Sequence, residues 1–139
     1  MKKLLTSLFI ILVSLAACQS KRVKVVDETW PDGKEKKVSY YSDDNKKNKI
    51  EEETYYPTGK LESKGTLKND LKDGEWVFMY PNGNKWSEGE FKNGKADGYR
   101  RVYYENGQLR YEGTYADGKE SGTWTFYDEN GKELKKQKF

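Results

Sequence analysis

Aromatic residues alternate with other residues along the second half of the chain. Trp76, Phe78 and Tyr80 are separated by single residues, and residues 109–115 alternate in the same way. A period of two residues predicts short β-strands with one covered face. No stretch after residue 18 shows a convincing helical period of 3.6 residues. The pattern therefore predicts an all-β protein.

Turn signals separate the predicted strands. Tyr80-Pro81-Asn82-Gly83 follows the first strand, and Glu105-Asn106-Gly107 and Glu129-Asn130-Gly131 occupy corresponding places. Glycine accepts the left-handed conformation that closes a hairpin with a bulge. Asn93-Gly94 stands where the second strand meets the next unit, and Asn-Gly is a turn signal. The chain is thus predicted to form an antiparallel sheet of successive β-hairpins.

The hairpins repeat with a period of 24 residues, which is the main organising feature of the sequence. The series include Gly59, Gly83, Gly107 and Gly131, then Gly65, Gly89 and Gly113, and also Tyr56, Tyr80 and Tyr104. This spacing predicts units at residues 49–72, 73–96 and 97–120, and a shorter unit at residues 121–139. Together they make a repeat domain over residues 49–139.

Residues 23–48 are interpreted as a degenerate first unit. Trp30-Pro31-Asp32-Gly33-Lys34 matches the turn that begins at Tyr56, but the polar run of residues 42–49 breaks the period. In the later units, Gly65, Gly89 and Gly113 fall inside the second strand, where glycine normally weakens a sheet. We expect an aromatic ring from the neighbouring strand to cover each of these glycines. The alternative is a β-bulge at each site.

The first 17 residues have the organisation of a signal peptide. Lys2 and Lys3 make the N-terminal region positively charged, and residues 4–17 are apolar apart from a threonine and two serines. That stretch is shorter than the roughly 20 residues that span a membrane comfortably. It ends in Leu15-Ala16-Ala17-Cys18, and Gln19 follows.

This segment resembles the lipobox of bacterial lipoproteins, in which a leucine and two small residues precede a cysteine that becomes acylated. The resemblance implies that residues 1–17 are removed, that lipid is attached to Cys18, and that residues 18–22 form a short tether. Two or more acyl chains hold a protein stably on a membrane. Gln19, rather than Asp, favours the outer membrane if the cell is Gram-negative. An ordinary signal peptide with an incidental cysteine is the alternative.

Composition narrows the possible chemistry. The 139 residues include no histidine and one cysteine, so triads based on histidine, intramolecular disulfides and cysteine-rich zinc sites are excluded. The hydrophobic residues that remain after residue 17 are mostly Trp, Tyr and Phe, so we expect an aromatic core rather than an aliphatic one. The formal net charge of +3 falls to +1 when Lys2 and Lys3 are removed with the signal peptide. We therefore expect no nucleic-acid partner.

No motif predicts catalysis, a cofactor or a metal site. Glu88 and Glu90 are paired carboxylates, but Glu88 recurs as Glu112 among lysines and arginines. Catalytic carboxylates need unlike environments that separate their pKa values. A solvated face with cross-strand ion pairs is the better interpretation. The acidic segments 43–45 and 128–130 superficially suggest calcium ligands. Neither belongs to a full calcium-binding loop with a distal bidentate glutamate.

The residues Tyr111-Glu112-Gly113 followed by Gly118-Lys119 and Gly122 resemble a MORN repeat. The twin tyrosines Tyr103-Tyr104 before Glu105-Asn106-Gly107 are typical of the bacterial variant, often labelled the YwqK-type antitoxin family. The resemblance covers residues 50–134 well and implies an extended, twisted sheet of hairpins that each contact only their neighbours.

These observations favour a non-enzymatic, lipid-anchored repeat protein of the cell envelope that acts as an interaction scaffold. Tyr55, Tyr103 and Tyr127 are the candidate interaction face, because tyrosine is enriched in interfaces. We expect one tyrosine of each pair to face the core and the other to be free for contact with a protein or an envelope polymer. An antitoxin or immunity protein is the first alternative, and a phospholipid-headgroup module is the second.

Overall fold

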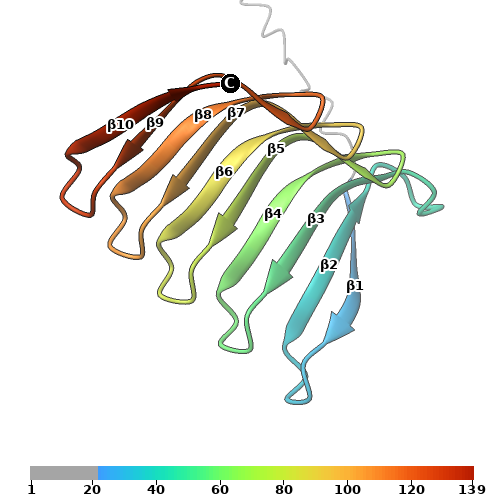
Figure 1. Cartoon of the computed structure of the whole chain (residues 1–139). Coiled ribbons are helices and arrows are strands. Elements are labelled where there is room, and N and C mark those ends of the chain that lie inside the picture. The colour runs from blue at the N-terminus through green and yellow to red at the C-terminus, as the bar shows by residue number, and fades with distance from the viewer. Residues whose placement is uncertain (1–21) are drawn as a thin grey trace, which may run out of the picture.

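The protein is a single antiparallel β-sheet in a computed structural model that describes residues 22–139. Ten strands follow one another in chain order, each hydrogen-bonded to the next, and the sheet curves along its length (Figure 1). The strands are β1 (Val23–Thr29), β2 (Glu35–Tyr41), β3 (Lys49–Tyr55), β4 (Leu61–Lys68), β5 (Leu71–Met79), β6 (Lys85–Lys92), β7 (Lys95–Tyr103), β8 (Leu109–Ala116), β9 (Lys119–Tyr127) and β10 (Glu133–Lys138). The predicted all-β class and the 24-residue hairpin repeat are confirmed.

The turns inside the units share one hydrogen-bonding pattern. In the turn between β5 and β6, the amide of Gly83 donates to the carbonyl of Tyr80, and the amide of Tyr80 donates to the carbonyl of Asn84. Gly83 has a φ of +96°, which an L-residue rarely adopts. A register shift between Phe78 and Met79 then places a bulge beside the turn. The predicted hairpin with a bulge is therefore present.

The turns between units are two-residue connections in the left-handed conformation. Asn93 and Gly94 have φ values of +49° and +82°. In the earlier turn, where other units carry Gly, Asp70 adopts a φ of +61° and completes the same kind of connection after Asn69. The amide of Gly94 donates to the carbonyl of Lys72, so adjacent turns are linked along this edge of the sheet.

Residues 23–41 form a hairpin of the same design. The amide of Gly33 donates to the carbonyl of Trp30, as Gly83 does to Tyr80. Residues 42–48 then make a longer loop before β3, closed by a hydrogen bond from the amide of Ser42 to the carbonyl of Asn48. This loop is the polar run that breaks the 24-residue period.

The two faces of the sheet differ in what they carry. Cross-strand register places Gly65, Trp76, Gly89, Arg100 and Gly113 in one row. We call this side the tryptophan face. A Cβ added to Gly65 would overlap the ring of Trp76. The expected covering ring is therefore confirmed at Gly65, where it belongs to Trp76. Gly113 has the same relationship to the ring of Trp124.

The expectation of a covering ring is wrong at Gly89. A Cβ there would meet the backbone oxygen of Tyr99 at 2.8 Å and Cδ of Arg100 at 3.1 Å. Arg100 occupies the position that Trp76 and Trp124 occupy one unit before and one unit after it. The period brings an arginine to this glycine from β7, and the ring of Trp76, its partner on β5, lies over Gly65 instead.

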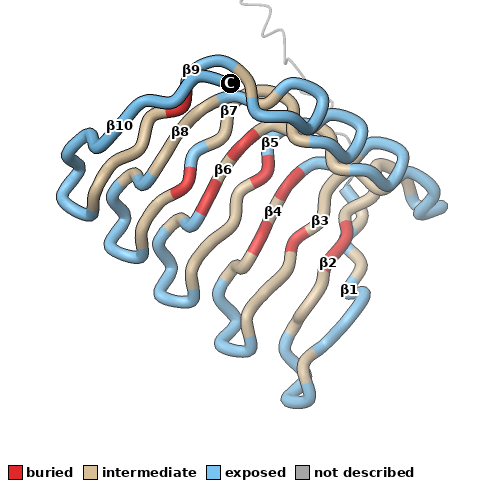
Figure 2. Tube along the Cα trace, viewed as in Figure 1, coloured by how far each residue is buried: buried red, intermediate tan, exposed pale blue. Residues whose placement is uncertain are grey.

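Buried residues lie near the middle of the strands, while the turns are exposed (Figure 2). Within residues 22–139, four hydrophobic residues are buried, and they are Val38, Trp76, Val102 and Trp124. The expected aromatic core is thus only half correct, because two of the four are valines. Val102 lies between Ser87 and Tyr111 in a central part of the sheet, where β-branched side chains pack well.

Candidate interaction face

The predicted lipidation site lies outside the described residues. Leu15, Ala16, Ala17 and Cys18 precede Arg22, the first residue that the structure describes. Arg22 itself contacts the sheet, because its guanidinium lies 2.6 Å from Oε1 of Glu51 and 4.3 Å from the ring centre of Tyr40. The chain therefore reaches the sheet on the side of Tyr40 and Glu51.

That side carries a row of alternating charges, and we call it the ladder face. It is opposite the tryptophan face, since successive strand residues point to opposite sides. Cross-strand register gives the row as Val38, Glu53, Lys64, Val77, Glu88, Arg101, Glu112, Thr125 and Lys136. Oppositely charged neighbours in such a row stabilise the pairing of the strands.

The three predicted contact tyrosines all lie on the ladder face, at the ends of β3, β7 and β9. The hydroxyl of Tyr55 donates to Glu53 at 2.6 Å, and Tyr103 donates to Glu88 at 2.6 Å. Tyr127 donates to Glu112 at 3.2 Å. All three side chains are partly buried. The structure therefore brings each predicted tyrosine to a glutamate of the charged row.

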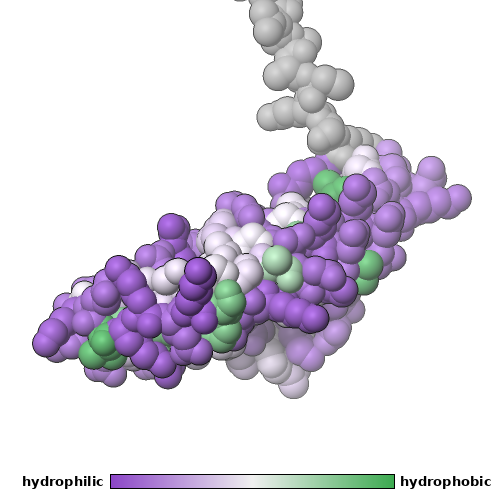
Figure 3. All heavy atoms as spheres, turned by 45° about the horizontal axis from the view of Figure 1, so that its top comes forward, coloured by the Kyte–Doolittle hydropathy of each residue, from purple (hydrophilic) through white to green (hydrophobic). Residues whose placement is uncertain are grey.

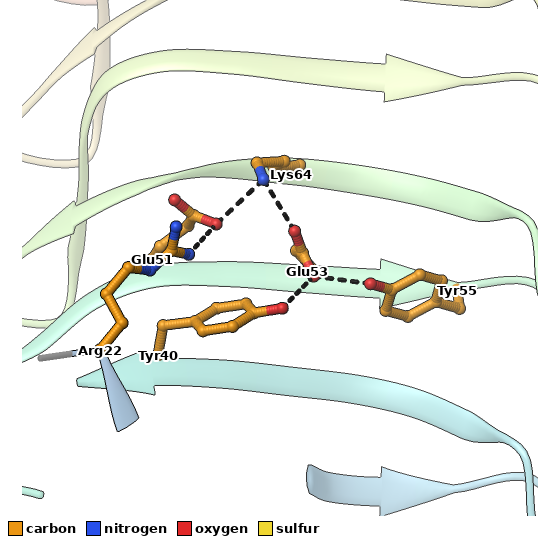
Figure 4. A network of polar contacts seen from close by, with 6 residues as sticks. All are labelled: Arg22, Tyr40, Glu51, Glu53, Tyr55 and Lys64. Carbon is orange, nitrogen blue, oxygen red and sulfur yellow. Dashed lines mark hydrogen bonds and ion pairs between the residues drawn. The ribbon is translucent and has the colours of Figure 1, made fainter. Parts of the chain in front are cut away.

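Glu53 is the centre of the first polar network (Figure 4). It is 7% exposed, and it accepts hydrogen bonds from Tyr40, Tyr55 and Lys64. Burial alone would raise the pKa of Glu53, but the hydrogen bonds from these three residues outweigh burial and lower the pKa. Burial and the bond to Glu53 raise the pKa of Tyr55. A fully satisfied network of this kind fixes its side chains firmly.

Lys64 joins this network to the end of the tether. Its Nζ lies 2.8 Å from Glu53 and 3.1 Å from Glu51, while Glu51 also pairs with Arg22 (Figure 4). Arg22, Glu51, Lys64 and Glu53 therefore form one continuous chain of ion pairs across β3 and β4.

Glu88 is the centre of a second network on the same face. It lies 2.5 Å from Nζ of Lys85, accepts the hydroxyl of Tyr103, and lies 3.8 Å from Arg101, which also pairs with Glu112 at 3.2 Å. Hydrogen bonds from Lys85 and Tyr103 outweigh the effect of burial and lower the pKa of Glu88. Burial and the bond to Glu88 raise the pKa of Tyr103 to about 12.

The expected cross-strand ion pairs are therefore present, but this part of the face is less solvated than expected. The side chain of Glu88 is 17% exposed. Glu90, its predicted companion, lies beside Gly98 and does not share the contacts of Glu88. Within residues 22–139, no group of three or more Cys, Asp or Glu residues is placed to hold a metal ion.

A tyrosine at the start of each of three turns contacts the next unit. Tyr56 and Tyr104 are the second members of the tyrosine pairs, whereas Tyr80 follows Met79. Tyr56 donates to the carbonyl of Met79, Tyr80 to that of Tyr103, and Tyr104 to that of Tyr127, at 2.7 to 2.9 Å. We expected one tyrosine of each pair to remain free for contact. That expectation is wrong for the hydroxyls, because both members of a pair are hydrogen-bonded. These tyrosines therefore offer ring surface, and not free hydroxyls, for contact.

Two further residues have roles that the sequence analysis missed. Trp30 donates from its indole to the carbonyl of Tyr55 and thereby begins the series of turn contacts. Phe139 packs edge-on against Trp124, with ring centres 6.1 Å apart, as Phe91 packs against Trp76. Phe139 is 24 residues beyond Tyr115, so continuing that series would have identified it.

Lys72 was also missed, and it makes unusual contacts on the tryptophan face. Its Nζ lies 4.1 Å from the ring of Trp76, 4.8 Å from Phe78 and 5.2 Å from Phe91. Burial lowers the pKa of Lys72. Ring faces attract cations, so the three rings retain a charge that burial disfavours.

The comparison with protein families agrees with this geometry. The model of the MORN repeat variant family matches residues 48–69, 72–93, 96–117 and 120–137. These matches cover more than half of the chain, and the chain belongs to this family. The first hairpin lies outside the matched residues. A comparison with curated proteins found no match. Over the part of the chain that the structure describes, no helix is long and apolar enough to cross a membrane.

Proposed function

We propose that this MORN-repeat protein is a non-enzymatic, lipid-anchored protein of the cell envelope that acts as an interaction scaffold. The observation that carries the proposal is the lone cysteine. Cys18 stands directly after Leu15-Ala16-Ala17, and β1 begins five residues later at Val23. The cysteine is therefore at the one position where a bacterial lipoprotein needs it, and a folded repeat domain follows at once.

The contacts of Arg22 support a defined orientation of the sheet on its anchor. Three residues stand between Cys18 and Arg22. The four steps along the chain span at most about 3.5 Å each, or about 14 Å in all. Arg22 is held on the ladder face by Glu51 and Tyr40. Lipid on Cys18 would therefore keep the end of the sheet near β2 and β3 close to the membrane and leave β10 far from it.

The surface composition supports a role in recognition rather than a second membrane contact. On the face drawn in Figure 3, hydrophilic residues cover most of the surface, and hydrophobic residues form small separate areas. The polar networks of the ladder face hold the rings of Tyr55, Tyr103 and Tyr127 in fixed positions at its rim. Rigid, partly exposed tyrosines bind partners at little cost in side-chain entropy.

The anchor can be tested by cell fractionation. Wild-type protein should sediment with membranes, and Cys18→Ser should not be acylated and should accumulate as unprocessed precursor or in the soluble fraction. Wild-type protein that is fully soluble after cell lysis would contradict lipid anchoring.

The scaffold role can be tested by photocrosslinking in intact cells. A photoreactive amino acid at Tyr103 reports on the ladder face, and the same group at Trp86, which is 45% exposed and contacts Phe78 on the tryptophan face, is the matched control. We expect a discrete crosslinked partner at Tyr103 and none, or a different one, at Trp86. Absence of any partner at Tyr55, Tyr103 and Tyr127 would contradict this role for the ladder face. A partner that is a toxin encoded beside this protein would identify an immunity protein instead.

A further inference from the structure

A recess near the C-terminal end of the tryptophan face has the features of a ligand site. It has a volume of about 330 Å³. Its lining includes Tyr104, Arg110, Tyr111, Phe126, Leu134 and Lys135. The rings of Tyr111 and Phe126 form its floor, with centres 5.8 Å apart and planes inclined at 40°. Aromatic lining with a few polar groups is typical of small-ligand sites, which start at about 300 Å³.

The two cations of the recess have no carboxylate partner in residues 22–139. Arg110 lies with its guanidinium carbon 5.4 Å from the ring centre of Tyr104, and Nζ of Lys135 lies 4.6 Å from that of Phe126. By contrast, Lys64, Lys85 and Arg101 on the ladder face are all paired with glutamates. The recess therefore offers two uncompensated positive charges beside exposed ring surface.

The chain contains an equivalent recess with the opposite charge. The recess two units earlier has a volume of about 210 Å³ and is lined by Tyr56, Glu62 and Phe78. These residues lie 48 positions before Tyr104, Arg110 and Phe126. Glu62 stands where the C-terminal recess has Arg110, and Trp86 stands where it has Leu134. The positive charge is therefore a property of the C-terminal recess and not of the repeat.

The floor of the recess limits what it can hold. Tyr111 and Phe126 are paired with each other across β8 and β9, and Phe126 is paired with Lys135 of β10. Their backbone groups are used within the sheet, so an extended peptide could not add a strand here. A ligand must instead be held by ring faces and by the two cations. Ring faces are negative and favour the weakly positive C–H groups of a sugar ring, and arginine matches a carboxylate with two hydrogen bonds.

We infer that the C-terminal recess binds a sugar unit that carries a carboxylate, such as a hexuronate residue of an acidic envelope polymer. The sugar ring stacks on Tyr111 and Phe126, and its carboxylate lies between Arg110 and Lys135. The binding chemistry does not depend on lipid anchoring, whereas the choice of an envelope polymer as its source rests on the proposed location of the protein.

The test is calorimetric titration of the full-length protein in a non-ionic detergent. The probes are an oligomer of galacturonic acid, a glucose oligomer of the same length, inorganic phosphate, and mixed detergent micelles that contain phosphatidylglycerol. We expect saturable binding of the galacturonic acid oligomer, with about tenfold weaker binding of the glucose oligomer, because a charge-assisted hydrogen bond is worth about 1.5–3 kcal/mol.

Arg110→Glu should weaken binding of the galacturonic acid oligomer at least about tenfold for the same reason. Lys138→Glu makes the same change in net charge on the exposed strand β10, outside the recess, and should have little effect. Arg110 and Lys138 are both exposed, so both variants should fold, which circular dichroism would verify.

Three results would overturn the inference. They are equal binding of the acidic and neutral oligomers or no binding of either, an equal loss of binding in Arg110→Glu and Lys138→Glu, and a preference for phosphate or for the phosphatidylglycerol micelles. None of them bears on the acylation of Cys18, which is measured separately.

Discussion

The hydroxyl of Tyr103 donates a 2.6 Å hydrogen bond to the carboxylate of Glu88. The two residues are 15 positions apart and lie on neighbouring strands, β7 and β6. The same spacing relates Tyr127 to Glu112, although that bond is longer at 3.2 Å. A tyrosine–glutamate pair therefore recurs in the last two units, where it joins β7 to β6 and β9 to β8 on the ladder face.

Tyr103→Phe should destabilise the protein by about 1–2 kcal/mol, because it removes a charge-assisted hydrogen bond from a carboxylate that stays partly buried. Urea unfolding of the two proteins measures this difference. Tyr127→Phe is the matched control, and we expect a smaller loss there because its bond to Glu112 is longer. A loss from Tyr127→Phe equal to or larger than that from Tyr103→Phe would contradict the importance of the shorter bond.

Gly113→Ala should destabilise the protein by about 1–3 kcal/mol, which is the usual cost of forcing extra atoms into a packed site. The new Cβ would overlap the ring of Trp124, which is 2% exposed and cannot move outward easily. Thermal unfolding measures the loss. In a Trp124→Leu background the same substitution should cost less, since the ring is gone. Equal costs in both backgrounds would show that the ring does not cause the effect.

Acid should destabilise the protein partly through Glu53. Its folded pKa is below the ordinary value of 4.5, so its contribution is present above that value and is lost as the pH falls through the folded pKa. Glu53→Gln should therefore be less stable than wild type at neutral pH. The difference between the two proteins should shrink in acid. Stability measured from pH 7 downward tests this, and a constant difference across the range would exclude a titrating role for Glu53.

Phe139→Ala should loosen the last hairpin. The ring of Phe139 covers one edge of Trp124, and its amide donates to the carbonyl of Gly122. Loss of such an aromatic pair costs about 0.5–1.5 kcal/mol beyond the burial that is lost. Hydrogen exchange should increase in β9 and β10 and stay the same in β3 to β6. Leu134→Ala, at a residue that is 61% exposed, is the control and should change neither region.

The repeat and its turns could be predicted from the sequence because each depends on local residues. Gly83 follows Tyr80-Pro81-Asn82, and such a segment specifies its own turn. The contact between Trp76 and Gly65 could also be predicted. The tryptophans and the strand glycines both follow the 24-residue period, so a tryptophan and its glycine keep the same separation wherever both occur. The same logic would have excluded a ring at Gly89, where the corresponding residue is Arg100.

The hydrogen-bonding partners of the tyrosines could not be predicted in this way. Tyr103 reaches Glu88 because β7 pairs with β6 so that Arg101 lies opposite Glu88, and Tyr103 is two residues further along the same face. The position equivalent to Tyr103 one unit earlier is Met79, so the tyrosine–glutamate pair does not recur in every unit of the sequence. Lys72 gave no signal, because its site combines rings from β5 and β6 that come together only in the folded sheet.

Incorporation of labelled palmitate tests the central claim, the lipid anchor on Cys18, most directly. Cells that express the full-length protein are grown with the label, and the protein is isolated under denaturing conditions. We predict that wild-type protein carries the label and that Cys18→Ala does not. Wild-type protein without label, or equal labelling of Cys18→Ala, would contradict a lipid-anchored repeat protein.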